Sequence, residues 1–209
     1  MKIVACKTWL SWMMLFIFSS NTGNAQQPII SFKVSVPDAA RQYYHVELNT
    51  EGLPTDSIIL KMPAWTPGYY QLMNYAEKVE NFKAFDKSGD ISWKKNSANS
   101  WKVGTTKGKA FTVSYDVKAI HNFVAGNFIN EERAYLSPTG VFVFPDGMID
   151  RSATISIEPY YKWSKVATGL PKIKGKANSF YAENFDVLFD SPILMGNLDS
   201  FPFFKVKNI

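Results

Sequence analysis

The stretch ISFKVSV at residues 30–36 alternates apolar and polar side chains without a break. Successive side chains of a β-strand point to opposite faces of a sheet, so this pattern predicts a strand with one buried face and one face in water. The stretch YHVELN at residues 44–49 repeats the alternation, and IILKM at residues 58–62 follows after a turn-forming segment. The first third of the chain therefore favours a β-sheet fold.

Short strand-like segments continue to the end of the chain, with Gly, Pro, Asn and Asp between them. They lie at residues 79–85, 91–94, 100–103, 110–119, 141–144, 153–158, 164–167, 179–182 and 201–206. We expect a tight turn at residues 86–90, a hairpin between residues 100–103 and 110–119, and one helical turn each at residues 70–78 and 184–188. The fold class that this spacing predicts is all-β: an antiparallel β-sandwich-like single domain with one or two short helical turns.

The first 25 residues have the three-part layout of a secretory signal peptide. Lys2 and Lys7 make the start basic, residues 9–18 are apolar, and a small, polar stretch ends at Ala25. An apolar run of this length is too short to span a bilayer, which needs roughly 20 residues. We therefore predict a signal peptide at residues 1–25, a single domain at residues 26–209, and export to the periplasm or the extracellular space. No later apolar run is long enough to span a membrane, so we expect no membrane contact after cleavage.

Charge and cysteine content narrow the function classes. The formal net charge is +5, and loss of Lys2 and Lys7 with the signal peptide lowers it to +3. The remaining lysines are scattered and form no basic stripe interleaved with aromatic residues, so nucleic-acid binding is not expected. The only cysteine, Cys6, lies within the predicted signal peptide. The exported domain would therefore contain neither a disulfide nor a cysteine nucleophile.

The sequence offers no recognisable catalytic or metal-binding motif. Its two histidines, His45 and His121, have no second histidine or cysteine at a metal-ligand spacing, and the pattern His-Glu-x-x-His is absent. We therefore expect no catalytic residue, no metal ligand and no cofactor in this chain. One alternative remains, a hydrolase that uses carboxylates alone, for which Asp186 and Asp190 have the spacing of one face of a helical turn.

The stretch MPAWTPGYY at residues 62–70 combines two prolines, a glycine and three aromatic rings. Pro67 and Gly68 predict the centre of a type II turn, because proline fixes φ near −65° and glycine accepts a positive φ. Trp65, Tyr69 and Tyr70 would then flank a rigid corner. Two interpretations stay open: a turn that seals one end of the β-core, or a preformed wall for a ligand or a neighbouring domain.

Three stretches taken together resemble a known family. They are WTPGYY at residues 65–70, YAEKVENF at residues 75–82 and FDVLFDSPILMGN at residues 185–197, with a strand around Trp101 between the second and the third. Their order and spacing resemble the N-terminal domain of the PDZ-containing glycyl aminopeptidases, which are zinc metallopeptidases of the gluzincin type. The similarity extends over nearly all of residues 26–209.

The resemblance implies a β-domain that packs against a thermolysin-like catalytic domain, in cis or in trans. In that family the zinc ligands and the general-base glutamate belong to the His-Glu-x-x-His helix of the catalytic domain, so zinc is expected there and this chain is expected to be inactive alone. The implied role is to brace the catalytic domain and to wall its cleft, meeting the peptide substrate only indirectly. The residues implied for the cleft wall or for binding are Trp65, Pro67, Gly68, Tyr69 and Tyr70. Those implied for the domain interface are Asp190, Pro192, Met195 and Gly196.

A second hypothesis comes from a different class: a free-standing secreted module that binds a peptide or a carbohydrate through the aromatic corner. Aromatic rings provide large rigid contact surfaces, which makes this use chemically reasonable. A smooth polar surface with one aromatic groove would favour the binding module. An exposed apolar patch would favour the peptidase domain, and its expected members are Phe189, Leu194, Met195, Phe201, Phe203 and Phe204.

Overall fold

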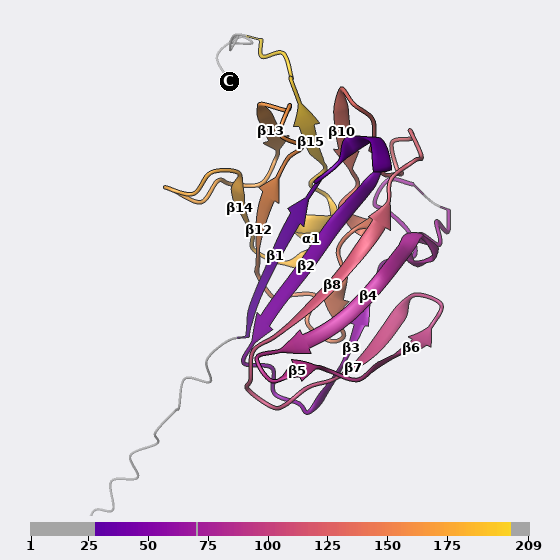
Figure 1. The fold of residues 1–209 in the computed structure, drawn as a ribbon, viewed down its shortest axis with the longest axis vertical. Helices are drawn as coiled ribbons and strands as arrows, with labels where there is room; N and C mark the ends of the chain where they lie inside the picture. The colour runs from indigo at the N-terminus through magenta and orange to yellow at the C-terminus, as the bar shows by residue number, and fades with distance from the viewer. Residues whose placement is uncertain (1–27, 70, 202–209) are drawn as a thin grey trace, which may run out of the picture.

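The structure, a computed structural model, describes residues 28–69 and 71–201, and its largest element is a seven-stranded sheet. The strand order is β14 (Ser179–Ala182), β12 (Ala153–Glu158), β1 (Ile29–Ser35), β2 (Tyr43–Glu51), β8 (Phe111–Lys118), β4 (Val79–Asp86) and β5 (Gly89–Asp90). This sheet lies across the front of the molecule in Figure 1.

Two four-stranded sheets complete the fold. One has the order β13 (Lys165–Thr168), β15 (Ile193–Gly196), β10 (Arg133–Leu136) and β9 (Phe128–Ile129). The other has the order β11 (Phe144–Pro145), β3 (Ser57–Lys61), β7 (Ser100–Gly104) and β6 (Trp93–Ser97). In Figure 1 the first lies toward the top and the second toward the bottom of the view, behind the large sheet.

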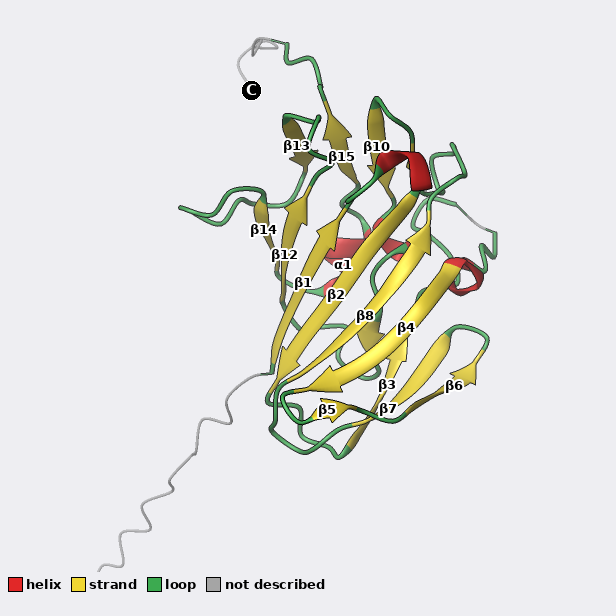
Figure 2. Ribbon diagram, in the orientation of Figure 1, coloured by secondary structure: helices red, strands yellow, loops and turns green. Residues whose placement is uncertain are grey.

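Helical structure in the described residues is confined to short segments (Figure 2). They are α1 (Phe185–Phe189) and the 3₁₀ turns η1 (Ala39–Arg41), η2 (Tyr75–Lys78) and η3 (Pro138–Gly140). Among the residues described, no helix has the length and apolar character that a membrane crossing requires.

The core forms between the sheets, and strands β1, β2 and β3 each bury every second side chain in it. In β2 the buried side chains are Tyr44, Val46, Leu48 and Thr50. One contact between two sheets is aromatic: the ring of Phe82 on β4 stacks on Trp101 of β7 with centroids 5.2 Å apart. Each fully buried apolar side chain contributes roughly 1.5–3 kcal/mol, so this inner layer dominates the stability of the fold.

The predicted all-β, sandwich-like single domain is confirmed. Expected strands correspond to β1, β2, β3, β4, β7, β8, β12, β13 and β14, and the helical turns expected at residues 70–78 and 184–188 correspond to η2 and α1. The predicted turn at residues 86–90 joins β4 to β5, with Asp86 paired to Gly89. One detail departs from a purely antiparallel arrangement, because β1 pairs in parallel with β12.

The hairpin expected between residues 100–103 and 110–119 is wrong. Strand β7 pairs with β3 and β6, whereas β8 pairs with β2 and β4 in the other sheet. The connecting loop is bonded elsewhere: the amides of Thr105 and Gly108 donate to the carbonyls of Asp56 and Leu53, both at 2.8 Å. These hydrogen bonds fix the loop where the chain passes from the sheet that contains β7 to the sheet that contains β8.

The strand expected at residues 141–144 is also wrong for all but its last residue. Val141, Phe142 and Val143 are each fully buried, so the run has no exposed face, and the amide of Phe142 bonds to the carbonyl of Pro138 at 2.9 Å. The sequence also missed β9, β10 and β15, which have two to four residues each and too little alternation to detect.

Two predictions fall wholly or mostly outside the described residues. The signal peptide at residues 1–25 lies there entirely, and it stays a prediction. Of the strand expected at residues 201–206, only Phe201 is described, and it is not in a strand. The expected strand at residues 91–94 only partly overlaps β6.

Candidate functional site

The aromatic corner, residues 65–69, is a tight turn of the predicted kind. The amide of Tyr69 donates to the carbonyl of Thr66 at 3.2 Å, with Pro67 and Gly68 between them. Gly68 has φ +76°, as the third position of a type II turn requires. The last residue of the predicted set, Tyr70, lies outside the described residues.

Buried contacts hold the aromatic corner against the body of the domain. The hydroxyls of Thr66 and Thr139 share a hydrogen bond of 2.6 Å, and both side chains are buried. On the far side of the turn, the Tyr69 ring packs edge-on against Phe123 with centroids 5.1 Å apart. Trp65 is the exception, because 56% of it is exposed. The corner is therefore a rigid base that presents one large aromatic ring to solvent.

Helix α1 and the residues that follow it place Asp190 and Pro192 of the second predicted set beside this corner. Its amino end is capped by Asn184, whose Oδ1 accepts from the amide of Val187 at 2.8 Å. The Phe189 ring, 8% exposed, lies 5.8 Å from the ring of Phe144. With Phe189 fixed inward, Asp186 and Asp190 stand at the surface.

The corner and the α1 segment together form two adjoining pockets. The first, which we call the Trp65 pocket, has a volume of about 400 Å³. It is lined by Pro63, Trp65, Pro67, Thr139, Phe144, Ile149, Asp186, Phe189 and Asp190. The second, the Tyr69 pocket, has a volume of about 270 Å³. It is lined by Thr66, Pro67, Gly68, Tyr69, Val124, Ala125, Tyr135, Ser137, Pro138, Phe189, Asp190 and Pro192.

Pro67, Phe189 and Asp190 line both pockets, so the two hollows meet along one ridge. In the Tyr69 pocket the Tyr135 hydroxyl donates to the carbonyl of Val124 at 2.9 Å. Burial, and to a smaller extent the nearby Tyr75, raises the pKa of Tyr135, which keeps this phenol a neutral donor. The ridge therefore separates an apolar hollow from one with more polar groups.

The two carboxylates at the Trp65 pocket have no partner for their charge among the residues described. The backbone amide of Asp190 bonds to the carbonyl of Asp186 at 3.1 Å, but neither side chain takes part in an ion pair or a side-chain hydrogen bond within residues 28–69 and 71–201. The site thus presents negative charge beside an apolar wall.

The structure gathers most of the predicted site residues but not all of them. Trp65, Pro67, Gly68 and Tyr69 meet Asp190 and Pro192 at the two pockets. Met195 and Gly196 lie instead in β15, and both are buried. A Cβ on Gly196 would come within 3.1 Å of the Glu132 carbonyl oxygen, so close packing inside the domain accounts for that glycine.

The expected apolar patch needs a correction at two of its members. Phe189 and Met195 point inward and are buried at 8% and 0% exposure, because α1 and β15 turn these side chains into the core. Phe201 is 89% exposed and Leu194 is half-buried, while Phe203 and Phe204 lie outside the described residues. The exposed apolar side chains that line the two pockets come from other segments: Trp65 and Ile149 in the Trp65 pocket, and Val124 in the Tyr69 pocket.

Sequence reasoning missed the part of the site that comes from the middle of the chain. Thr139, Phe144 and Ile149 complete the Trp65 pocket. The local signal was the turn-forming Ser137-Pro138-Thr139-Gly140, but nothing in it indicates a contact with residues 63–67. Only the tertiary fold brings these segments together.

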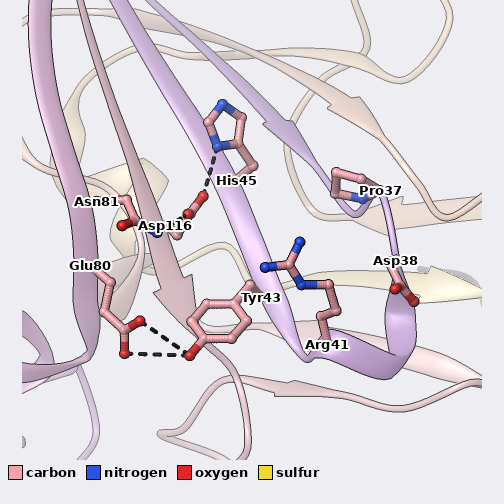
Figure 3. Close-up of a pocket in the computed structure, with 8 residues that line it drawn as sticks. All are labelled: Pro37, Asp38, Arg41, Tyr43, His45, Glu80, Asn81 and Asp116. Atoms are coloured by element: carbon pink, nitrogen blue, oxygen red, sulfur yellow. Dashed lines mark hydrogen bonds and ion pairs between the residues drawn. The ribbon is translucent and has the colours of Figure 1, made fainter.

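A third hollow, the polar groove, lies over β2, β4 and β8 (Figure 3). Its volume is about 320 Å³, and it is lined by Pro37, Asp38, Arg41, Tyr43, His45, Glu80, Asn81 and Asp116. Asp116 accepts from His45 Nδ1 and from Asn81 Nδ2, both at 2.7 Å. Tyr43 donates to Glu80 at 3.2 Å. These polar groups bind one another across three neighbouring strands.

The donor set of the described residues does not fit a catalytic zinc. Within that part of the chain there is no group of three or more His, Cys, Asp or Glu side chains that could hold a metal ion. His45 is committed to Asp116, and His121 lies in a loop with its ring 5.6 Å from that of Phe123. A zinc site needs at least three convergent ligands.

Comparison with known proteins gives one family and several similar structures. The family model of the Peptidase M61 N-terminal domain matches residues 31–197. A search of the curated proteins returned no match. The crystal structure of an aminopeptidase N family protein from Idiomarina loihiensis superposes with a TM-score of 0.80 and 25% identity, over 87% of this chain and 31% of that one.

Two structures of an M1 zinc metallopeptidase from Deinococcus radiodurans are more distant. A substituted form bound to the substrate Tyr-Ser-Ala gives a TM-score of 0.48 and 11% identity, over 82% of this chain and 43% of that one. The unsubstituted enzyme gives 0.44 and 11%, over 81% and 42%. The chain therefore spans less than half of the length of each of these proteins.

Proposed function

The chain belongs to the family of Peptidase M61 N-terminal domains, and on this premise we propose that it packs against a thermolysin-like catalytic domain and walls one side of that domain's substrate cleft. The role is structural and non-catalytic. The zinc ligands and the general base would come from the catalytic domain, because the described residues offer no three-ligand metal site.

One observation supports this proposal above the others. The aromatic corner and the α1 segment line two adjoining pockets, although they are more than one hundred residues apart in the sequence. Trp65, which lines one of these pockets, is exposed to solvent. A rigid aromatic surface of this kind suits a contact with another folded domain, where large rings give much buried area for little loss of side-chain entropy.

The finer identity rests on the sequence. The motifs at residues 65–70, 75–82 and 185–197 support a PDZ-containing glycyl aminopeptidase as the assembled protein, and the basic, apolar and polar layout of residues 1–25 supports its export to the periplasm or beyond. The free-standing binding module is the less favoured alternative, because the family match covers nearly the whole described domain.

Association with a catalytic domain tests the proposal. The purified chain would be titrated by calorimetry with a separately produced catalytic domain of a Peptidase M61 enzyme. We expect saturable binding that Trp65→Ala weakens and that Lys33→Ala, a residue of β1 that lines neither pocket, leaves unchanged. Absence of binding, or equal loss with both variants, would contradict the proposed interface.

A further inference from the structure

The Trp65 pocket has the composition of a ligand site more than that of a flat contact surface. Its walls are apolar, with the exposed ring of Trp65 on one side and the rings of Phe144 and Phe189 behind it. Its volume of about 400 Å³ falls within the range of small-ligand pockets, roughly 300–1,000 Å³. An apolar group of one or two side chains fits such a space.

The rim of the pocket carries two carboxylates. Asp186 and Asp190 line the same hollow as Trp65 and have no ion-pair partner in the described part of the chain. The protein as a whole is basic, with a formal net charge of +5, so this local negative potential runs against the overall charge.

The polar groups of the pocket disfavour a carbohydrate. The hydroxyl of Thr139 is engaged with Thr66 at 2.6 Å. Apart from it, the lining side chains that carry polar atoms are the two carboxylates and the Trp65 indole N–H. A sugar needs several donors and acceptors in fixed positions, whereas this rim offers mainly charge.

The pocket is largely preformed. Pro63 and Pro67 fix the backbone on the Trp65 side, and the carbonyl of Ile149 accepts from the amide of Phe185 at 2.8 Å on the other. Little conformational freedom is lost when a ligand enters a site built this way, which favours binding.

We propose that the Trp65 pocket binds a peptide segment in which a bulky apolar residue is followed by a lysine or an arginine. The apolar side chain enters between Trp65 and Phe189, and the cation lies between Asp186 and Asp190. This proposal rests on the proposed function and makes it more specific. The cleft wall would be a specificity subsite for the substrate residues that follow the free amino terminus.

Blocked dipeptides test this inference without a free amino group. The chain would be titrated with acetyl-Phe-Lys-amide, acetyl-Phe-Glu-amide and acetyl-Gly-Lys-amide, and binding would be followed by calorimetry and by two-dimensional NMR. We expect acetyl-Phe-Lys-amide to bind at least about tenfold more tightly than either of the others. Equal affinity for all three peptides would overturn the proposal.

Substitutions locate the site. Asp186→Asn with Asp190→Asn should reduce the preference for lysine over glutamate to about unity, while Glu158→Gln, an exposed carboxylate of β12, should leave it unchanged. Unfolding in urea verifies that each variant is folded. If the double variant does not fold, the preference for lysine over glutamate is measured on each single variant. An unchanged preference in a folded variant would overturn the assignment of the rim.

The same titration in the presence of a saturating catalytic domain separates the two proposals. If that domain binds and the peptides do not, the subsite is wrong and the packing role stands. If the peptides bind and the domain does not, the packing role is wrong and the pocket stands as a peptide site. If the domain abolishes peptide binding, the pocket is covered in the assembled enzyme and the subsite is overturned.

Discussion

The Trp65 pocket and the polar groove both combine aromatic rings with carboxylates, yet they use the carboxylates in opposite ways. In the polar groove, Asp116 accepts hydrogen bonds from His45 and Asn81, and Glu80 accepts one from Tyr43 (Figure 3). In the Trp65 pocket, Asp186 and Asp190 have no such partners among the residues described.

The difference teaches how to separate a structural network from a binding surface. A carboxylate that is already bonded to its neighbours gains little from a new ligand, because the old bonds must first be broken. A carboxylate without a partner beside an apolar wall can gain both an ion pair and buried area. Substitutions in the polar groove should therefore lower the free energy of unfolding, whereas substitutions at the rim of the Trp65 pocket should lower the affinity for a peptide.

The largest expected effect concerns the floor that the two pockets share. Phe189 is 8% exposed and packs against Phe144 and Phe185 with ring centroids 5.8 and 5.7 Å away. Phe189→Ala should lower the free energy of unfolding by roughly 3 kcal/mol, because it leaves a cavity in the core. Urea denaturation measures this. Ile149→Ala, at the 37% exposed wall of the Trp65 pocket, should cost less than half as much, and equal losses would show that the floor is not core.

The next largest effect is expected in the polar groove, where a substitution should change stability but not peptide binding. Asp116 connects β8 to His45 on β2 and to Asn81 on β4, with both bonds at 2.7 Å. Asp116→Ala should cost about 1–2 kcal/mol in the free energy of unfolding, less than a fully buried network would, since its side chain is 24% exposed. Binding of acetyl-Phe-Lys-amide should not change. A variant that loses the peptide at full stability would reverse the roles of the two hollows.

The rim of the pocket should show the opposite behaviour. With 56% of Trp65 exposed, Trp65→Ala removes little buried surface, so we expect a change in unfolding free energy below about 1 kcal/mol. Peptide affinity should fall at least about tenfold, which corresponds to roughly 1.4 kcal/mol. Calorimetry and urea denaturation on the same preparation make the comparison. A large loss of stability with unchanged affinity would return the corner to a turn that seals the core.

The sequence predicted those parts of the fold and of the candidate site that depend on local rules. Alternation located β1 and β2 because a period of two decides the burial of each side chain. The turn at residues 66–69 was predictable because Pro67 restricts φ and Gly68 accepts φ +76°. The run at residues 141–144 escaped because a segment buried on all sides has no period.

The sites depend on contacts that no local rule contains. Thr66 meets Thr139 across 73 positions, and His45 meets Asp116 across 71. Sequence motifs drew attention to Trp65 and Asp190 separately, but their meeting at one pocket follows from how the sheets stack. That Asp190 has no charge partner among the described residues likewise becomes visible only when its neighbours are known.

The smallest expected effect tests whether the groove is held by its backbone or by its side chains. Asn81 has φ +54° in the middle of β4, at the register shift between Glu80 and Lys83, and its amide donates to Asp116. Asn81→Gly loses that bond, worth about 1 kcal/mol, but relieves a left-handed conformation that costs a similar amount. The two terms oppose each other, so the free energy of unfolding should change by less than about 0.5 kcal/mol. Asn81→Ala loses the bond without the relief and should be clearly less stable. If both variants lose the same free energy of unfolding in urea, the hydrogen bond to Asp116 alone stabilises the bulge. The backbone conformation of Asn81 then contributes nothing to the stability of the groove.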